Sequence, residues 1–211
     1  MDKDKIDKKE HILDVAEKGF SELGYDGAST RMISGEAGVN MAMLNYYFGS
    51  KEGLYLAVFE RKISAFRTVL QNIGNDETTS AWDKMEFAID KYVERTINNN
   101  CFHKLINREL TLNKRTELGD KMITILMTNV NEFKKIMQDG VDSGAFNQDI
   151  DLEFAVMTIF GTKNFIINSP HISSLLLGKN TLDEHFLESE LKPRMKLYMK
   201  TLLKPYLVKQ Q

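Results

Sequence analysis

The chain has 211 residues, 42% hydrophobic and 27% charged, the composition of an ordinary globular protein. Its formal net charge of −2 excludes a strongly basic protein that would bind nucleic acid through bulk charge alone. The single cysteine, Cys101, excludes an internal disulfide and suits a reducing compartment. The sequence has neither a signal-peptide pattern nor the roughly 18–20 continuous apolar residues of a membrane span. We therefore expect a cytoplasmic protein with no membrane partner.

The N-terminal quarter predicts a helix followed by short, capped segments. Apolar residues recur at helical spacing, and no run alternates as a strand would. A first helix is expected over about 7–23, ended by Gly24 in a left-handed C-cap. Four residues on one face of this helix are expected to point inward: Leu13, Ala16, Phe20 and Leu23.

Two short helices are expected next. Ser29 or Thr30 caps the first of them, which stops at Gly38. Asn40 is a natural N-cap for the second, over residues 41–47. The buried side of the second helix is expected to carry Leu44, Tyr47 and Phe48.

Longer helices are expected over the rest of the chain. Gly49 ends the preceding short helix, and Ser50 caps a fourth helix that continues to Gly74. The following helices are predicted over about 80–97, 102–112, 116–142, 151–168 and 182–207, with a weaker segment over 172–177. The fold class is therefore all-α.

The turn Gly38-Val39-Asn40 between two short helices has the spacing of a helix-turn-helix. In such a motif the second helix enters the major groove and its N-terminal side chains meet base edges. Four residues then point outward: Met41, Ala42, Asn45 and Tyr46. An ordinary helical corner accounts for the spacing equally well, because small residues such as Ala37 also let two helices approach closely.

The stretch from Ser29 to Leu54, STRMISGEAGVNMAMLNYYFGSKEGL, resembles the DNA-binding region of the TetR family of bacterial repressors. The resemblance is strong over about residues 8–60. Its matching elements are Thr30, Ile33, Ala37-Gly38-Val39, Leu44, Tyr47-Phe48, Ser50-Lys51-Glu52 and Leu54, preceded by Ala16, Phe20, Gly24 and Tyr25. Two positions depart from the family pattern. Ser34 replaces a usual alanine, and Asn45 replaces a tyrosine, whose contact Tyr46 or Tyr47 would take over.

The resemblance implies a DNA-binding surface. Lys51 at a helix N-terminus can meet a phosphate, as can Thr30 and Arg31 across the groove. Asn45 can pair with adenine or remain a polar surface residue. The expected DNA-binding residues are Thr30, Arg31, Asn40, Met41, Ala42, Asn45, Tyr46, Tyr47 and Lys51.

The resemblance also implies two domains. A helix-turn-helix domain is expected over 1–50, with the start of a connecting helix to about 60. A larger helical domain over 51–211 is expected to bind a small-molecule effector and to dimerise. Adaptable Met and Phe side chains suit a pocket, although core packing explains each one as well. The expected pocket residues are Phe102, His103, Arg108, Met122, Met127 and Phe160.

A homodimer is expected through the last two long helices. Gly161 is small enough for close helix approach, and aromatic residues recur at spacings of three and four. The expected interface residues are Phe154, Thr158, Gly161, Phe165, Met195, Tyr198 and Leu202. Packing of both stripes against the core of one chain is the alternative.

An enzyme and a module that does not bind DNA are the two alternatives to a transcriptional regulator. The four histidines lack metal-ligand spacing and no glycine-rich phosphate loop occurs, so we expect no catalytic residue, metal or cofactor. The basic last helix also fits a small-molecule-binding or membrane-surface module without DNA binding. The expected function is a repressor that binds double-stranded operator DNA and that a small molecule releases.

Overall fold

The computed structural model describes residues 2–98 and 117–209, in which helices form the regular structure apart from an isolated bridge between Phe146 and Val208. The all-α fold class is confirmed. The described residues form two compact units, which we call the N-terminal unit (2–65 and 117–126) and the C-terminal unit (66–98 and 127–209). No helix in these ranges is long and apolar enough to span a membrane. The sequence-based domain boundary at residue 50 stays a prediction.

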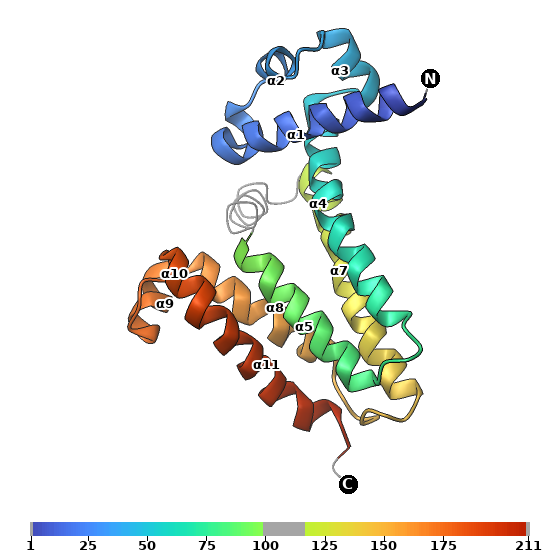
Figure 1. The fold of residues 1–211 in the computed structure, drawn as a ribbon, viewed down its shortest axis with the longest axis vertical. Helices are drawn as coiled ribbons and strands as arrows, with labels where there is room; N and C mark the ends of the chain where they lie inside the picture. The colour runs from blue at the N-terminus through green and yellow to red at the C-terminus, as the bar shows by residue number, and fades with distance from the viewer. Residues whose placement is uncertain (1, 99–116, 210–211) are drawn as a thin grey trace. The chain divides into compact units, whose positions relative to one another are not determined.

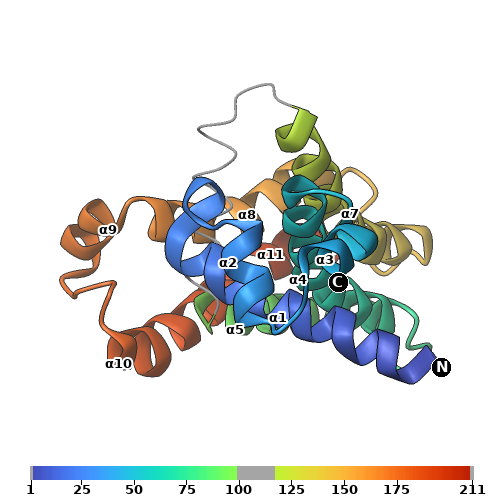
Figure 2. The ribbon, with the colours of Figure 1, turned by 90° about the horizontal axis from the view of Figure 1, so that it is seen from above.

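The N-terminal unit contains α1 (Asp2–Gly27), α2 (Thr30–Glu36), α3 (Met41–Phe48), the first part of α4 (Lys51–Gly74) and the start of α7 (Glu117–Asp142). Helix α1 packs against α2, and α2 packs against α3 (Figure 2). The backbone of Gly24 has φ 74°, outside the helical region, so α1 is kinked there. The helix therefore breaks at Gly24 as predicted, although its ψ of 177° is not that of a left-handed C-cap, and a short helical stretch follows to Gly27.

Apolar side chains from all of these helices form the core of the N-terminal unit. Leu13, Ala16 and Phe20 are buried as predicted, whereas Leu23 is half exposed. The ring of Phe20 lies edge-on to that of Tyr55 on α4, with 4.9 Å between centroids. The other buried members include Ile12, Ala28, Ile33, Ala37, Leu44, Leu54, Val58, Phe59, Leu118 and Met122.

The C-terminal unit contains the rest of α4 together with α5 (Ala81–Asn98), most of α7 (Glu117–Asp142), α8 (Leu152–Asn168) and α9 (Pro170–Leu177). It ends with α10 (Glu184–Phe186), the π turn η1 (Leu187–Leu191) and α11 (Lys192–Leu207). Helices α5 and α11 run side by side (Figure 1).

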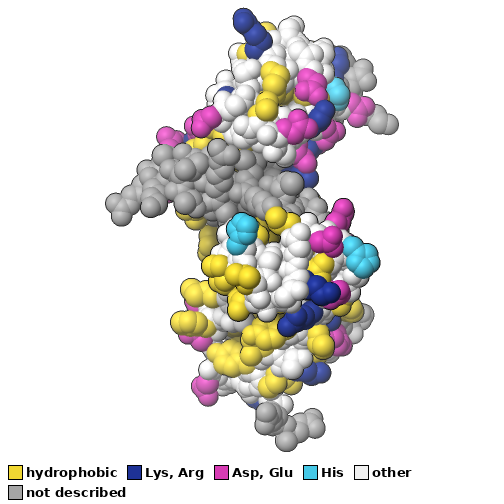
Figure 3. All heavy atoms as spheres, turned by 90° about the vertical axis from the view of Figure 1, so that its left-hand side faces the viewer, with side chains coloured by type: hydrophobic (Ala, Val, Ile, Leu, Met, Phe, Trp, Pro, Cys, Tyr) yellow, Lys and Arg dark blue, Asp and Glu magenta, His cyan; other side chains and the backbone are white. Residues whose placement is uncertain are grey.

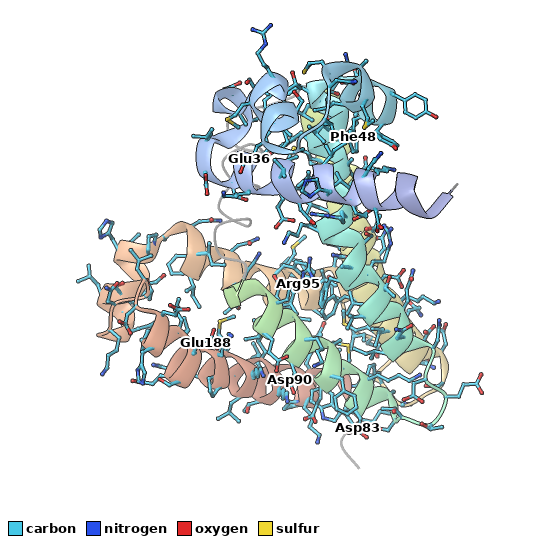
Figure 4. The ribbon with its side chains drawn as sticks, turned by 45° about the horizontal axis from the view of Figure 1, so that its top comes forward. Glu36, Phe48, Asp83, Asp90, Arg95 and Glu188 are labelled. Carbon is cyan, nitrogen blue, oxygen red and sulfur yellow. The ribbon has the colours of Figure 1, made fainter. Side chains whose placement is uncertain are left out.

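Two ion pairs hold α11 against α5. The ammonium of Lys196 lies 2.8 Å from the Glu94 carboxylate, and that of Lys200 lies 2.8 Å from Asp90. Figure 4 labels Asp90 where the two helices meet. Both lysines belong to the basic last helix, whose composition also fits a membrane surface. In this fold they pair with carboxylates of the same unit.

The π turn corrects the prediction of one continuous helix over 182–207. Phe186 and Leu191 are both buried, yet five residues apart they would lie about 140° apart around an α-helix. A π turn, with its wider i→i+5 hydrogen bonding, places residues five apart on one face. The backbone N–H of Lys192 accordingly donates to the Leu187 carbonyl. Helical spacing alone does not signal such a turn.

Candidate nucleic-acid interface

Side-chain caps fix the start of each helix around the turn. The hydroxyl of Ser29 accepts a hydrogen bond from the backbone N–H of Met32 at 3.1 Å. The side-chain oxygen of Asn40 accepts from the N–H of Met43 at 2.8 Å. These bonds confirm Ser29 and Asn40 as N-caps. They satisfy N–H groups that the first helical turns leave without a backbone partner.

Glycine backbone conformations set the two turns of the motif. Gly38, between α2 and α3, has φ 64°, and Gly49, after α3, has φ 72°. L-residues with a side chain rarely adopt such angles. Ser50 then opens α4 by accepting the N–H of Gly53 at 3.0 Å. The short helix α3 is thus held at both ends.

One side of α3 is buried and the other faces solvent. Leu44 is fully buried, while Tyr47 and Phe48 are half-buried. On the opposite side Tyr46 is 74% exposed and Met41 is 37% exposed, and Ala42 and Asn45 are also exposed. The four residues predicted to point outward therefore do so. A large aromatic side chain held in solvent on a rigid helix is suited to contact another molecule.

Ser34, which stands where the family usually has alanine, shapes this surface. Its side chain is buried, and its hydroxyl lies 3.0 Å from the Arg31 carbonyl and 3.3 Å from the Met41 sulfur. The alanine usual in the family could make neither contact. Ser34 therefore positions Met41 at the N-terminus of α3. Only its departure from the family pattern could have drawn attention to it.

The cationic residues expected at DNA phosphates lie near helix starts. Arg31 is exposed in the first turn of α2, and Thr30 beside it is half-buried. Lys51 begins α4, with its ammonium 3.3 Å from the Asp26 carbonyl and 4.7 Å from the centroid of the Tyr25 ring. These contacts hold the ammonium in place, and its remaining N–H groups can donate to a phosphate.

An ionic cluster fastens α1 to α4 behind this surface. The Arg61 guanidinium lies 2.8 Å from Asp14, 2.9 Å from Glu17 and 3.2 Å from Glu10. Desolvation opposes the charge, but the hydrogen bonds that the guanidinium donates to these carboxylates raise the pKa of Arg61 above its ordinary value. Lys62 adds a 2.6 Å pair to Glu17. The helix that leaves the motif is therefore fixed to the helix that enters it.

Two family models match this architecture. Residues 12–58 match the model for bacterial regulatory proteins of the TetR family, and residues 83–192 match the tetracycline repressor-like C-terminal domain. The second match covers more than half of the chain. The chain belongs to the TetR family. The capped motif is thus the helix-turn-helix of a TetR-family protein and not an ordinary helical corner.

Full-length relatives and solved structures agree with the TetR assignment. The fatty acid metabolism regulator protein of Bacillus subtilis is 27% identical over 86% of this chain and 95% of its own length. The repressor NicS of Pseudomonas putida is 26% identical over 83% of each chain. The fold resembles the B. subtilis regulator FadR crystallised with stearoyl-CoA, with a TM-score of 0.70 and 21% identity over 90% of this chain and 97% of that chain. The chain is a ligand-responsive, DNA-binding regulator of transcription.

The residues expected in the effector pocket are not all within the described ranges. Phe102, His103 and Arg108 lie outside them. Met122 is buried in the N-terminal unit, whereas Met127 is exposed in the C-terminal unit. Phe160 packs against Tyr92 at 4.7 Å between ring centroids. The pocket stays a prediction.

A groove of about 550 Å³ lies between α5 and α11, lined by Trp82, Leu197 and Lys204 among others. None of the residues expected in the pocket lines it, so the groove does not support that prediction.

Most residues expected at a dimer interface lie on the surface of the C-terminal unit. Phe154 is 66% exposed, and Gly161, Phe165, Tyr198 and Leu202 are also exposed, with Thr158 half-buried. Met195 does not belong to this set, because its side chain is buried in the core of its own protomer together with Met199 and Leu203.

Proposed function

We propose that this TetR-family protein is a cytoplasmic, non-catalytic repressor that binds operator DNA as a homodimer and that an acyl-chain effector releases. The observation that carries the DNA part is the exposed face of α3. That helix is capped by Asn40 and anchored by buried Leu44, so its outer side chains are presented rigidly. Base contacts would come from Met41, Ala42, Asn45 and Tyr46, and phosphate contacts from Thr30, Arg31, Tyr47 and Lys51.

The test of DNA binding starts from fragments that the pure protein selects from random DNA. The affinity of the selected sequence is then measured against salt concentration. Lys51→Ala should weaken binding and lower the salt slope by about one, whereas Asn45→Ala should relax base preference at one position. Lys135→Ala, which removes an exposed lysine of the C-terminal unit, should leave the slope unchanged. If the selected DNA fragments share no common sequence, the result would contradict sequence-specific binding.

The homodimer is supported by the apolar surface of the C-terminal unit. Figure 3, which views this unit from the side of α9 and α10, shows hydrophobic side chains gathered in clusters on its surface. Patches of this kind on a folded protein mark interaction sites. The partner we propose is a second copy of this chain. The helix-turn-helix motifs of two symmetric protomers can bind two DNA half-sites that lie one or more helical turns apart. The exposed large residues of α8 and α11 are Phe154, Met157, Phe165, Leu197, Tyr198, Leu202 and Tyr206.

Gly161 offers a clean test of the dimer. A Cβ added there meets no atom within 4 Å, so Gly161→Arg is compatible with the fold of one protomer. Sedimentation should show monomers for this variant at micromolar concentration, with weak operator binding and unchanged helical circular dichroism. Asp139→Arg places the same side chain at an exposed position of α7, and this variant should remain dimeric. A Gly161→Arg protein that stays dimeric would contradict this interface.

The acyl-chain effector is supported by the Bacillus subtilis matches, which comprise a regulator named for fatty acid metabolism and a structure of FadR crystallised with stearoyl-CoA. The aromatic and aliphatic core of the C-terminal unit suits an apolar chain. Dodecanoate and dodecanoyl-CoA, each below its micelle concentration, are the probes. At least one should weaken operator binding about 5- to 150-fold, the usual range of allosteric coupling. Unchanged operator affinity with both would contradict release by an acyl chain.

A further inference from the structure

Four helices of the C-terminal unit contribute one aromatic side chain each to a connected cluster. Its members are Phe66 on α4, Tyr92 on α5, Phe133 on α7 and Phe160 on α8. The ring centroids of Tyr92 and Phe160 are 4.7 Å apart, those of Phe133 and Phe160 are 5.5 Å apart, and those of Tyr92 and Phe133 are 5.8 Å apart. Phe160 is only partly buried, so the cluster reaches the surface of the unit.

A lysine lies against this cluster. Lys163 follows Phe160 by three residues on α8, and its ammonium is 5.7 Å from the centroid of the Tyr92 ring. The residue is only 6% exposed. Within the described part of the chain the ammonium has no hydrogen-bond or ion-pair partner, and the ring face supplies weak compensation. Desolvation lowers the pKa of Lys163 from 10.5 to about 8.

The other buried lysine among the described residues has a carboxylate partner, since Lys192, which is 7% exposed, pairs with Glu188 at 2.5 Å. The half-buried Arg61 contacts three carboxylates. A buried charge is ordinarily paired because desolvation without compensation is costly. Lys163 departs from this pattern inside the unit that we propose to bind the effector.

A second cation lies at the same cluster. Arg95 on α5, labelled in Figure 4, has its guanidinium 5.5 Å from the centroid of the Phe66 ring. Desolvation lowers the pKa of Arg95. The centroid of Phe66 is in turn 6.2 Å from that of Tyr92. Apart from the Tyr92 phenol, the rings from the four helices carry no titratable group. The cluster therefore combines an apolar wall with positive charge, the chemistry that binds an amphipathic anion.

We infer that Lys163 pairs with the carboxylate of the effector, whose apolar chain packs against the aromatic cluster of Phe66, Tyr92, Phe133 and Phe160. This inference rests on the proposed function and narrows its effector to a free carboxylic acid. A thioester has no negative charge at the acyl end and would leave the ammonium unpaired. A neutral alcohol of the same chain length would do so as well.

The experiment compares three ligands with the same chain by isothermal titration calorimetry at pH 7. Wild-type protein should bind dodecanoate at least tenfold more tightly than 1-dodecanol or dodecanoyl-CoA. Lys163→Met keeps the length of the side chain and removes its charge, so it should weaken dodecanoate binding at least tenfold and change dodecanol binding less than twofold. Lys135→Met, at an exposed lysine of the same unit, should bind all three ligands as the wild type does.

The pH dependence of binding provides a readout that a merely structural role for Lys163 would not change. A bound carboxylate raises the pKa of the ammonium, so the complex retains a proton that the free protein loses above about pH 8. Dodecanoate affinity of the wild type should therefore fall up to tenfold between pH 8 and pH 9. The affinity for dodecanol, and that of Lys163→Met for dodecanoate, should stay constant.

Three results would overturn the inference and leave operator binding by α3 intact. One is equal affinity of the wild type for dodecanoate and dodecanol. Another is a preference for dodecanoate that survives in Lys163→Met. The third is tight binding of dodecanoyl-CoA with no measurable binding of dodecanoate. Failure of the protein to select any DNA sequence would instead contradict the proposed function.

Discussion

The two units differ in one buried charge, and most of the exposed large apolar side chains among the described residues lie in the C-terminal unit. In the N-terminal unit Arg61 contacts three carboxylates. In the C-terminal unit Lys163 is buried against an aromatic ring, and Leu175 on α9 is 85% exposed. The ionic cluster of the N-terminal unit is thus paired within the chain, which suits a rigid DNA-binding unit. The C-terminal unit carries a charge and a surface that a ligand and a partner would complete.

The largest expected effect concerns the buried lysine. At neutral pH the folded protein holds Lys163 charged although its pKa is lowered from 10.5 to about 8, which costs about 3 kcal/mol at about 1.4 kcal/mol per pH unit. Lys163→Met should therefore raise the free energy of unfolding by up to that amount at pH 7, measured by urea denaturation at fixed protein concentration.

The sign of the pH dependence is set by proton binding. Between pH 8 and pH 10.5 the unfolded chain holds the Lys163 proton and the folded chain does not, so wild-type stability rises with pH in that window relative to the variant. The advantage of Lys163→Met should be full below pH 8 and absent by pH 10.5. A destabilised variant at pH 7 would show that the charge is already compensated in the free protein.

The next effect concerns the paired cation of the N-terminal unit. Arg61→Met removes the shared partner of Glu10, Asp14 and Glu17 and should destabilise the protein by about 1–2 kcal/mol, because charged hydrogen bonds of a partly buried group are lost. Thermal unfolding measures the change. Lys18→Met removes an exposed pair with Glu36 and should have a much smaller effect. Equal effects of the two variants would mean that the cluster around Arg61 stabilises the N-terminal unit no more than an exposed ion pair does.

The smallest effect concerns the cap of the reading helix. Asn40→Ala removes the bond to the Met43 N–H and should cost about 1 kcal/mol, whereas Asn40→Asp keeps an acceptor there. Hydrogen exchange of the α3 amides should accelerate in the alanine variant and not in the aspartate variant. Identical exchange in both would mean that packing of Leu44 alone holds α3 in place.

The local features of the N-terminal unit could be predicted from sequence. A cap such as Ser29 or Asn40 acts within three residues, and a glycine such as Gly38 marks a turn through its own backbone. The outward direction of Tyr46 followed from subtracting the buried face of one short helix. Ser34 escaped the prediction because its contact with the Met41 sulfur crosses the turn.

Features that depend on the partners of a helix could not be predicted in the same way. Met195 was placed with Tyr198 and Leu202 because spacings of three and four unite residues across a wide arc, but three positions are about 60° short of a full turn. That offset puts Met195 in the core and Tyr198 on the surface. Lys163 likewise gave no sequence signal, since its burial depends on α5 packing against α8.

The π turn before α11 has a consequence for how this segment can change in evolution. Loss of one residue between Phe186 and Leu191 would restore ordinary helical winding and leave these two residues four apart, about 40° around an α-helix and still on one face. The stripe of Tyr198 and Leu202 would therefore keep its direction. The π turn thus accommodates one extra residue without turning α11. Homologues that are one residue shorter here would present the same side of α11 to another molecule.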